Sequence, residues 1–162
     1  MIYLILTSFI IFLVYNIISI CKLKNIPSCL SETYYLWPKL VFPIVMFLVS
    51  GLILPVWLEL LEGSNFQFCA FIICIALMFI GASPDYKNND LDYKVHSTFT
   101  YVISIITIIT IFIIFGYWEI LLINLFIITL LFFITNFRKY WLFIIELCLF
   151  LSVYTTLIIK IF

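Results

Sequence analysis

The stretch Gly81–His96, GASPDYKNNDLDYKVH, is the longest polar interval of a chain that is otherwise mostly apolar. It contains three of the eight acidic residues, two of the eight basic residues and the only histidine. Long apolar segments precede and follow it, and they have the composition of membrane helices. The stretch therefore indicates a polar link between two groups of membrane-spanning helices.

The composition of the whole chain supports the same class of protein. Of the 162 residues, 67% are hydrophobic and only 10% are charged, whereas a soluble domain has roughly half apolar and about a quarter charged residues. So few charges could not cover the apolar surface in water, and we expect a multi-pass membrane protein surrounded by lipid. The net charge is zero and no basic run occurs, so we expect no nucleic-acid partner.

Apolar segments of helix length predict an all-α bundle of six transmembrane helices in a single domain, residues 1–162. The expected spans cover about 1–20, 40–60, 66–80, 92–115, 120–135 and 140–159. The first lacks the basic start and small residues of a cleaved signal peptide, so we expect it to be retained. Ser31 or Thr33 is expected to cap a helix in the first link, and Pro43 and Pro55 are expected to kink the second span.

The distribution of basic residues predicts the orientation of the six spans. Links one, three and five together contain seven of the eight, namely Lys22, Lys24, Lys39, Lys87, Lys94, Arg138 and Lys139. The eighth, Lys160, lies near the C-terminus, and links two and four have none. Because cytoplasmic links are enriched in Lys and Arg, we expect these three links in the cytoplasm and both termini outside it. The expected location is the cytoplasmic (inner) membrane.

The five cysteines are expected to be unpaired thiols without a metal. Three lie inside apolar runs, where a thiol behaves as a small hydrophobe: Cys69, Cys74 and Cys148. Cys21 and Cys29 are too far apart for a CxxC ligand pair, and no second pair exists to complete a zinc site. We expect no cofactor.

Polar residues of the fourth span are spaced so that they share one helical face. Asp92 and His96 are four residues apart. Four hydroxyl residues fall within about 120° on the same side, namely Thr100, Ser104, Thr107 and Thr110. Lipid disfavours such a stripe, so it should face the bundle interior or a wet crevice. Two interpretations stay open: the hydroxyls bond backbone carbonyls or neighbouring helices, or Asp92 orients His96 as a proton carrier or general base.

Glu146 is a carboxylic acid within the sixth span. An intramembrane acidic residue is a candidate functional site and requires a partner. His96, Lys94 and Arg138 are the expected partners, because all of them lie toward the inner leaflet in the six-span arrangement. The alternative is a neutral carboxyl group that is hydrogen-bonded inside the bundle.

Within the central polar link, residues 83–85 (Ser-Pro-Asp) and 88–90 (Asn-Asn-Asp) have the composition of turns and of an N-cap for the fourth span. Asp85, Asp90 and Asp92 could alternatively hold a divalent cation through their oxygens. The link lacks the central Gly and distal Glu of an EF-hand loop. We therefore expect solvated loop carboxylates and no metal site.

At Ser31-Glu32-Thr33-Tyr34-Tyr35, and again from Gly81-Ala82-Ser83-Pro84 to Lys94-Val95-His96, the sequence resembles uncharacterised small multi-pass membrane proteins of gut Bacteroidetes and their phages. That resemblance implies a cytoplasmic-membrane location and no particular reaction. The chain is also similar, more weakly, to the ceramidase and progestin-receptor class of membrane hydrolases. Ser83, Asp85, Asp92 and His96 match the first part of their polar pattern. Those proteins use several histidines around zinc in seven spans, whereas this chain has one histidine, so no zinc ligand is carried over.

Two functions from different classes follow from these features. The first is a non-enzymatic channel, transport-like component or partner-binding protein with a polar site at the cytoplasmic face. It would act through self-association or another membrane protein, and its candidate intramembrane residues are Glu146, Thr100, Ser104 and Thr107. The alternative is a membrane-embedded hydrolase acting on lipid, with the residues His96 as base, Asp92 as orienter and Ser83 or Asp85 assisting.

Overall fold

The computed structural model describes residues 1–23, 26–134 and 140–162, and the elements within these ranges are helices and connections, without a strand. Six α-helices follow one another, α1 (Ile2–Leu23), α2 (Val41–Leu60), α3 (Phe68–Ala82), α4 (Asp90–Ile109), α5 (Trp118–Phe133) and α6 (Trp141–Ile161). A 3₁₀-helix, η1 (Leu30–Leu36), lies between α1 and α2, and a π-helical turn, η2 (Thr110–Ile114), extends α4. The predicted all-α architecture is confirmed.

Four helices in the described ranges are long and apolar enough to cross a membrane by length and composition: α1, α2, α4 with η2, and α6. The other two are apolar but shorter, with 15 residues in α3 and 16 in α5. At 1.5 Å per residue these two extend for about 22 and 24 Å, less than the roughly 30 Å of a bilayer core. The expected nature of the chain as a membrane protein is supported by this set of helices.

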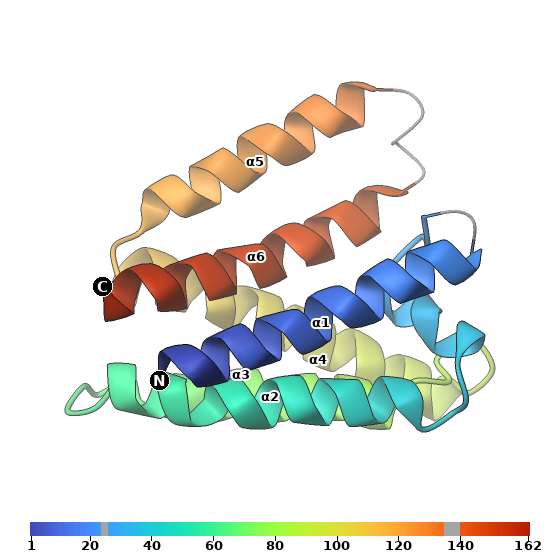
Figure 1. Cartoon of the computed structure of the whole chain (residues 1–162), viewed down its shortest axis with the longest axis horizontal. Helices are drawn as coiled ribbons and strands as arrows, with labels where there is room; N and C mark the ends of the chain where they lie inside the picture. The colour runs from blue at the N-terminus through green and yellow to red at the C-terminus, as the bar shows by residue number, and fades with distance from the viewer. Residues whose placement is uncertain (24–25, 135–139) are drawn as a thin grey trace.

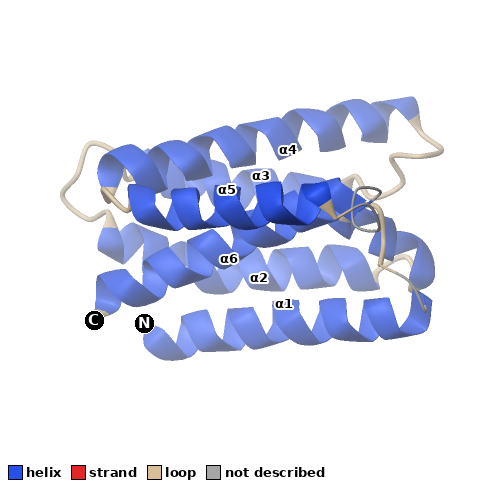
Figure 2. Cartoon of the chain, turned by 90° about the horizontal axis from the view of Figure 1, so that it is seen from above, coloured by secondary structure: helices blue, strands red, loops and turns tan. Residues whose placement is uncertain are grey.

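The helices lie alongside one another with their long axes in roughly the same direction (Figures 1 and 2). Both termini are at the same end of the bundle as the α2–α3 and α4–α5 connections (Figure 1). The opposite end holds η1 and the connection from α3 to α4, residues 83–89. We call η1 together with residues 83–89 the polar end.

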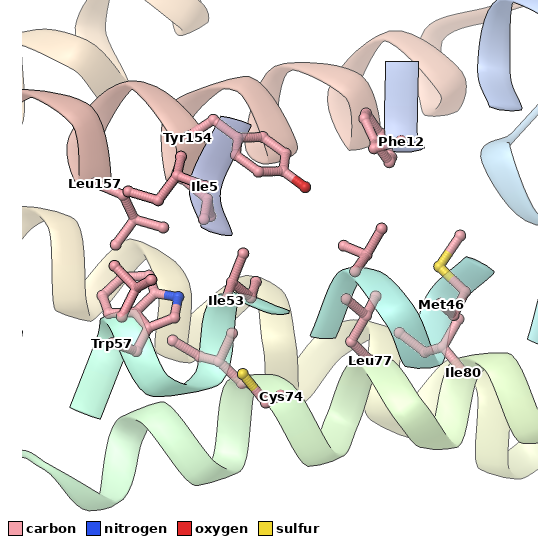
Figure 3. Close-up of a cluster of buried hydrophobic side chains, with 14 of the residues drawn as sticks. Ile5, Phe12, Met46, Ile53, Trp57, Cys74, Leu77, Ile80, Tyr154 and Leu157 are labelled. Carbon is pink, nitrogen blue, oxygen red and sulfur yellow. The ribbon is translucent and has the colours of Figure 1, made fainter. Parts of the chain in front are cut away.

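The core is formed chiefly by one face each of α1, α2, α3 and α6. Trp57, Phe12 and Phe42 are its largest fully buried side chains. Figure 3 shows Trp57 of α2 facing Leu157 of α6, and Phe12 stacks on Phe150. Gly81 allows α3 to approach α2 closely, because an added Cβ would lie 2.8 Å from the Cβ of Met46. Helix α5 is at the edge of the bundle, and none of its residues is buried.

Local sequence explains where the helices begin and end. The side chain of Asn89 caps α4 by accepting a hydrogen bond from the Leu91 N–H at 2.9 Å, as predicted for this link. Gly116 follows η2 with φ of +73°, a left-handed conformation that glycine adopts without strain. Only Pro55 lies in the interior of α2. Pro43 falls in the first turn, where a backbone N–H has no partner within the helix. The kink predicted at Pro43 is therefore not expected from its position.

The first link differs from its prediction. Ser31 and Thr33 do not cap the helix that begins there, because η1 has Cys29 at its N-cap and no side-chain cap. Both residues are buried instead. The Thr33 hydroxyl donates to the Leu30 carbonyl at 2.6 Å and contacts the Tyr15 hydroxyl at 2.8 Å. Tyr34 belongs to the core. The link therefore folds back over the end of the bundle.

Candidate functional site

A cavity of about 70 Å³ lies inside the bundle, between η1 and helices α2, α3, α4 and α6. Most of its wall is aliphatic or aromatic, with Phe42, Met46 and Leu77 among the lining residues. Six lining residues have polar side chains: Ser31, Thr100, Ser104, Thr107, Glu146 and Tyr154. Because one water needs roughly 10–15 Å³ of such volume, the cavity can hold several waters or a small ligand.

The polar stripe of α4 faces this cavity. Thr100, Ser104 and Thr107 all line it, and Thr110, further along the helix, is fully buried. The hydroxyls of Thr100 and Ser104 each donate to the carbonyl four residues earlier, at 2.8 Å. Thr110 does the same at 2.7 Å. This is the backbone-bonding arrangement that one of the two sequence interpretations predicted.

Glu146 enters the cavity wall from α6. Its Oε2 accepts a hydrogen bond from the Leu30 N–H at 2.6 Å, at the start of η1. Nearby, the Phe143 N–H donates to the Ser28 carbonyl at 3.1 Å, so two bonds attach α6 to the first link. The other carboxyl oxygen, Oε1, accepts no hydrogen bond from the described residues. This backbone partner was not among those predicted.

Of the predicted partners of Glu146, His96 and Lys94 do not bond its carboxyl group. The ring nitrogens of His96 bond Ser31 and Ser83, and Lys94 is exposed. Arg138 lies outside the described residues. The prediction missed Leu30 because a backbone N–H leaves no signature in the side-chain sequence.

His96 is buried between the two parts of the polar end. Its Nδ1 lies 3.2 Å from the carbonyl oxygen of Ser83, and its Nε2 lies 2.8 Å from the Ser31 hydroxyl. The imidazole ring also stacks on Tyr86, with centroids 4.8 Å apart. A carbonyl oxygen only accepts, so Nδ1 carries a proton, and in the neutral ring Nε2 accepts from Ser31.

The predicted Asp92–His96 pair is therefore not formed as a hydrogen bond. Asp92 lies one turn before His96 on α4 and is half-buried, while both ring nitrogens are occupied by Ser31 and Ser83. Two residues on the same helical face lie near each other, but this does not determine which groups the imidazole nitrogens bond. Here the Ser31 hydroxyl and the Ser83 carbonyl determine the orientation of the His96 ring.

The other predicted catalytic residues form the turn of the polar end. Ser83 contacts His96 through its carbonyl and not its hydroxyl. The Asp85 carboxylate accepts from the Asn88 side chain at 2.7 Å, and the Asp85 carbonyl accepts from the N–H groups of Asn88 and Asn89, both at 3.1 Å. Across residues 1–23, 26–134 and 140–162, no three His, Cys, Asp or Glu side chains come together as metal ligands. The alternative cation site at Asp85, Asp90 and Asp92 is not assembled.

Three polar contacts join η1 and its N-cap residue Cys29 to residues 83–89. Lys87 forms a salt bridge with Glu32 at 2.7 Å, and its N–H donates to the Tyr35 hydroxyl at 2.9 Å. The Cys29 thiol lies 3.2 Å from the Tyr86 hydroxyl. These contacts hold the polar end over the cavity.

The surroundings of the titratable groups at the polar end change their pKa values. Burial alone would raise the pKa of Glu32, but hydrogen bonds from Lys87 and Ser28 outweigh it and lower the pKa below its ordinary value of 4.5. The hydrogen bond to Glu32 raises the pKa of Lys87. Burial raises the pKa of Cys29 and that of Tyr86, so Cys29 is a neutral thiol and not a reactive thiolate.

Comparison of the chain with family models, curated proteins and solved structures finds no match. The chemistry of the cavity and the polar end must therefore be inferred from their own residues.

Proposed function

We propose that this protein is a six-span protein of the cytoplasmic membrane with both termini outside the cytoplasm, and that it binds a small ligand in its cavity as a non-enzymatic channel or transport component. The alternation of basic links supports this orientation. Helices α3 and α5 lie alongside the four longer helices (Figure 2), which supports counting them as spans. Flanking residues or local thinning of the bilayer would make up their short length.

One observation carries the functional part of the proposal. Glu146 lines a mostly apolar cavity inside the bundle and has one carboxyl oxygen without a hydrogen bond from the described residues. An acidic group inside a membrane is costly, and such groups line substrate or ion pathways in many membrane proteins. The cavity lies next to the polar end, so a ligand would enter from the cytoplasmic side in the proposed orientation.

The proposal is tested by blocking the cavity with a bulky side chain and measuring transport. Proteoliposomes containing the protein would be assayed for uptake of protons, potassium and small organic cations. We expect flux of at least one of these, and we expect Thr107→Phe to abolish it by occupying the cavity. Thr129→Phe is the matched control, because Thr129 is exposed on α5. Absence of binding and flux, or unchanged flux in a folded Thr107→Phe protein, would refute the proposal.

Self-association or association with another membrane protein belongs to the same proposal. The exposed surface of α5 includes Leu122, Phe126 and Phe133, which suits either lipid or a neighbouring helix. Native mass spectrometry of the protein released from nanodiscs would give the subunit number. A closed oligomer is expected for a pore, whereas a monomer favours a ligand carrier.

A second function is favoured by one contact. Ser31 Oγ lies 2.8 Å from His96 Nε2, and the Ser83 carbonyl accepts from the other ring nitrogen. That is the nucleophile, base and orienter arrangement of a serine hydrolase, and Ser31 faces a cavity whose walls suit an acyl chain. In this lipid hydrolase Ser31 would be the nucleophile, and Asp92 and Asp85 would have no catalytic role.

A fluorophosphonate probe separates the two functions. A hydrolase would be labelled covalently at Ser31, and Ser31→Ala or His96→Ala would abolish labelling while the protein stays folded. Absence of labelling of the wild-type protein in nanodiscs would remove the hydrolase hypothesis and leave the binding function.

A further inference from the structure

Most hydroxyl groups of the cavity wall donate their protons to other groups of the protein. Thr100 and Ser104 donate to carbonyls of their own helix. The carbonyl of Ser83 fixes the proton of His96 on Nδ1, so the neutral ring accepts the Ser31 proton at Nε2. At these three positions the oxygen can offer a ligand only its remaining lone pairs.

The same holds at the far end of the cavity. Ser8 donates its single hydroxyl proton to the Val49 carbonyl at 3.2 Å. Its 2.8 Å contact with Tyr154 must then be donated by the tyrosine. Tyr154 therefore also faces the cavity as an acceptor. Thr107 is the one lining hydroxyl that has no hydrogen-bond partner among the described residues.

The charge of the wall agrees with this pattern. Glu146 is the one carboxylic acid among the lining residues, and the described part of the wall contains no Lys, Arg or His side chain. Its Oε2 is used by the Leu30 N–H, and its Oε1 is unused by the described residues. A ligand must therefore supply hydrogen-bond donors and, when Glu146 is ionised, a positive charge.

We infer that the cavity binds the primary ammonium group of a small organic amine. This rests on the proposed binding function and names its ligand class. Three N–H donors would meet Glu146 Oε1 and the hydroxyl oxygens of Thr100 and Ser104, and the carbon body would contact aliphatic walls. A cavity of about 70 Å³ suits a body of a few carbons, since a cavity of about 150 Å³ accepts benzene.

Two other cationic ligands fit less well. Calcium requires about six to eight oxygen ligands, and the wall offers its few oxygens mainly along one helix and one carboxyl group. A zwitterionic lipid headgroup would bring its phosphate against a wall whose described residues include no cation. We therefore assign a free amine and not a lipid amine.

The experiment compares three probes of nearly equal shape: n-propylammonium, n-propanol and propionate. Binding to the protein in phosphatidylcholine nanodiscs is measured by ligand-observed NMR titration, with empty nanodiscs subtracted, because the choline headgroup has no N–H. Four heavy atoms allow a dissociation constant on the order of 1 mM for propylammonium. We expect propanol to bind at least about tenfold more weakly and propionate not to bind.

Variants place the binding at the cavity. Glu146→Gln keeps the side-chain shape and should weaken propylammonium binding at least about tenfold. Glu62→Gln, at an exposed position outside the cavity, is the matched control and should change nothing. Thr100→Val keeps the shape at a second wall position, and a loss of about two- to fivefold is expected from one acceptor. It keeps the inference testable if Glu146→Gln does not fold.

Each remaining outcome has a definite meaning. Equal binding of propanol and propylammonium, or unchanged propylammonium binding in folded Glu146→Gln, overturns the ammonium assignment while the cavity stays a ligand site. Competition by phosphatidylethanolamine in the nanodisc overturns the assignment to a free amine. If no probe binds above the empty nanodisc, this inference fails, and the flux assay with protons and potassium still decides the proposed function.

Discussion

Ser31 contributes its oxygen to the cavity wall and its proton to His96. The residue is buried, and so is the ring nitrogen that it satisfies. Ser31→Ala leaves that nitrogen without a partner, which costs about 1–3 kcal/mol for a buried group. We expect this loss in the unfolding free energy of the protein in detergent.

Ser97→Ala is the control for this prediction, because Ser97 lies next to His96 on α4 and donates only to the Tyr93 carbonyl of its own helix. It should change stability by less than about 0.5 kcal/mol. Equal effects of the two substitutions would show that the Ser31–His96 bond contributes no specific stability.

The Glu32–Lys87 pair gives the polar end a dependence on pH. Glu32 has a lowered pKa in the folded protein, so its stabilising contribution is present above its ordinary value of 4.5 and declines as pH falls through the lower folded value. Lys87 is exposed and Glu32 is partly exposed, so solvent screens the pair and the coupling is small, about 0.2–1 kcal/mol at neutral pH. A double-mutant cycle with Glu32→Gln and Lys87→Met should show this coupling at neutral pH and its loss in acid. A coupling independent of pH would contradict the ionic character of the contact.

At the scale of elements, Gly81 sets the distance between α2 and α3. Gly81→Ala would place a Cβ 2.8 Å from the Cβ of Met46, a rigid atom close to the backbone. Overpacking of this kind costs about 1–3 kcal/mol, and the better helix propensity of alanine returns roughly 0.5–1 kcal/mol of it. We expect a net destabilisation in thermal unfolding.

Gly51→Ala is the matched substitution in α2, where an added Cβ meets no atom within 4 Å. It gains the same propensity without a clash, so it should be neutral or stabilising. If both alanine variants behave alike, the close approach of α2 and α3 does not depend on Gly81.

The elements themselves were largely predictable, and the reason is the length of the apolar runs. The expected second span, 40–60, corresponds to α2 at Val41–Leu60, and the expected sixth, 140–159, to α6 at Trp141–Ile161. Asn89 was predictable as a cap from its type and position. The burial of Ser31 and Thr33 in η1 was not, because a polar segment beside a membrane helix has the same composition whether it is solvated or folded under the bundle.

The site was predictable only where side-chain periodicity determines it. Helical spacing placed Thr100, Ser104 and Thr107 on one face of α4, and the three do line one cavity. The partner of Glu146 is the backbone N–H of Leu30, and one of the two partners of His96 is the backbone carbonyl of Ser83. Backbone groups are present at every position, so the sequence gives no signal for which of them a buried polar side chain will meet.

At the scale of the whole molecule, the orientation in the membrane is the first property to test. Ser64 lies between α2 and α3, and Asn88 lies between α3 and α4, at opposite ends of the bundle (Figure 1). In a background with Cys21 and Cys29 replaced by serine, Ser64→Cys should react with an impermeant maleimide in intact cells. Asn88→Cys should react only after the membrane is opened, because link three is expected inside.

Labelling of both positions from the same side would refute the proposed alternation, because α3 would then not cross the membrane. Labelling of Asn88→Cys alone in intact cells would reverse the orientation and place the polar end outside the cytoplasm. In both cases the route proposed for the ligand would have to change.

The hydrogen bond from Leu30 to Glu146 joins positions that are 116 residues apart. Ribosomes add about 5–20 residues per second, so Glu146 is made roughly 6–23 s after Leu30. Throughout that interval η1 lacks the carboxylate that receives its first N–H, and the Ser28 carbonyl lacks its partner on Phe143. A chain whose synthesis stops before Trp141 would therefore be a membrane-inserted intermediate with unpaired backbone groups at its surface, a substrate for quality-control proteases rather than a smaller working protein.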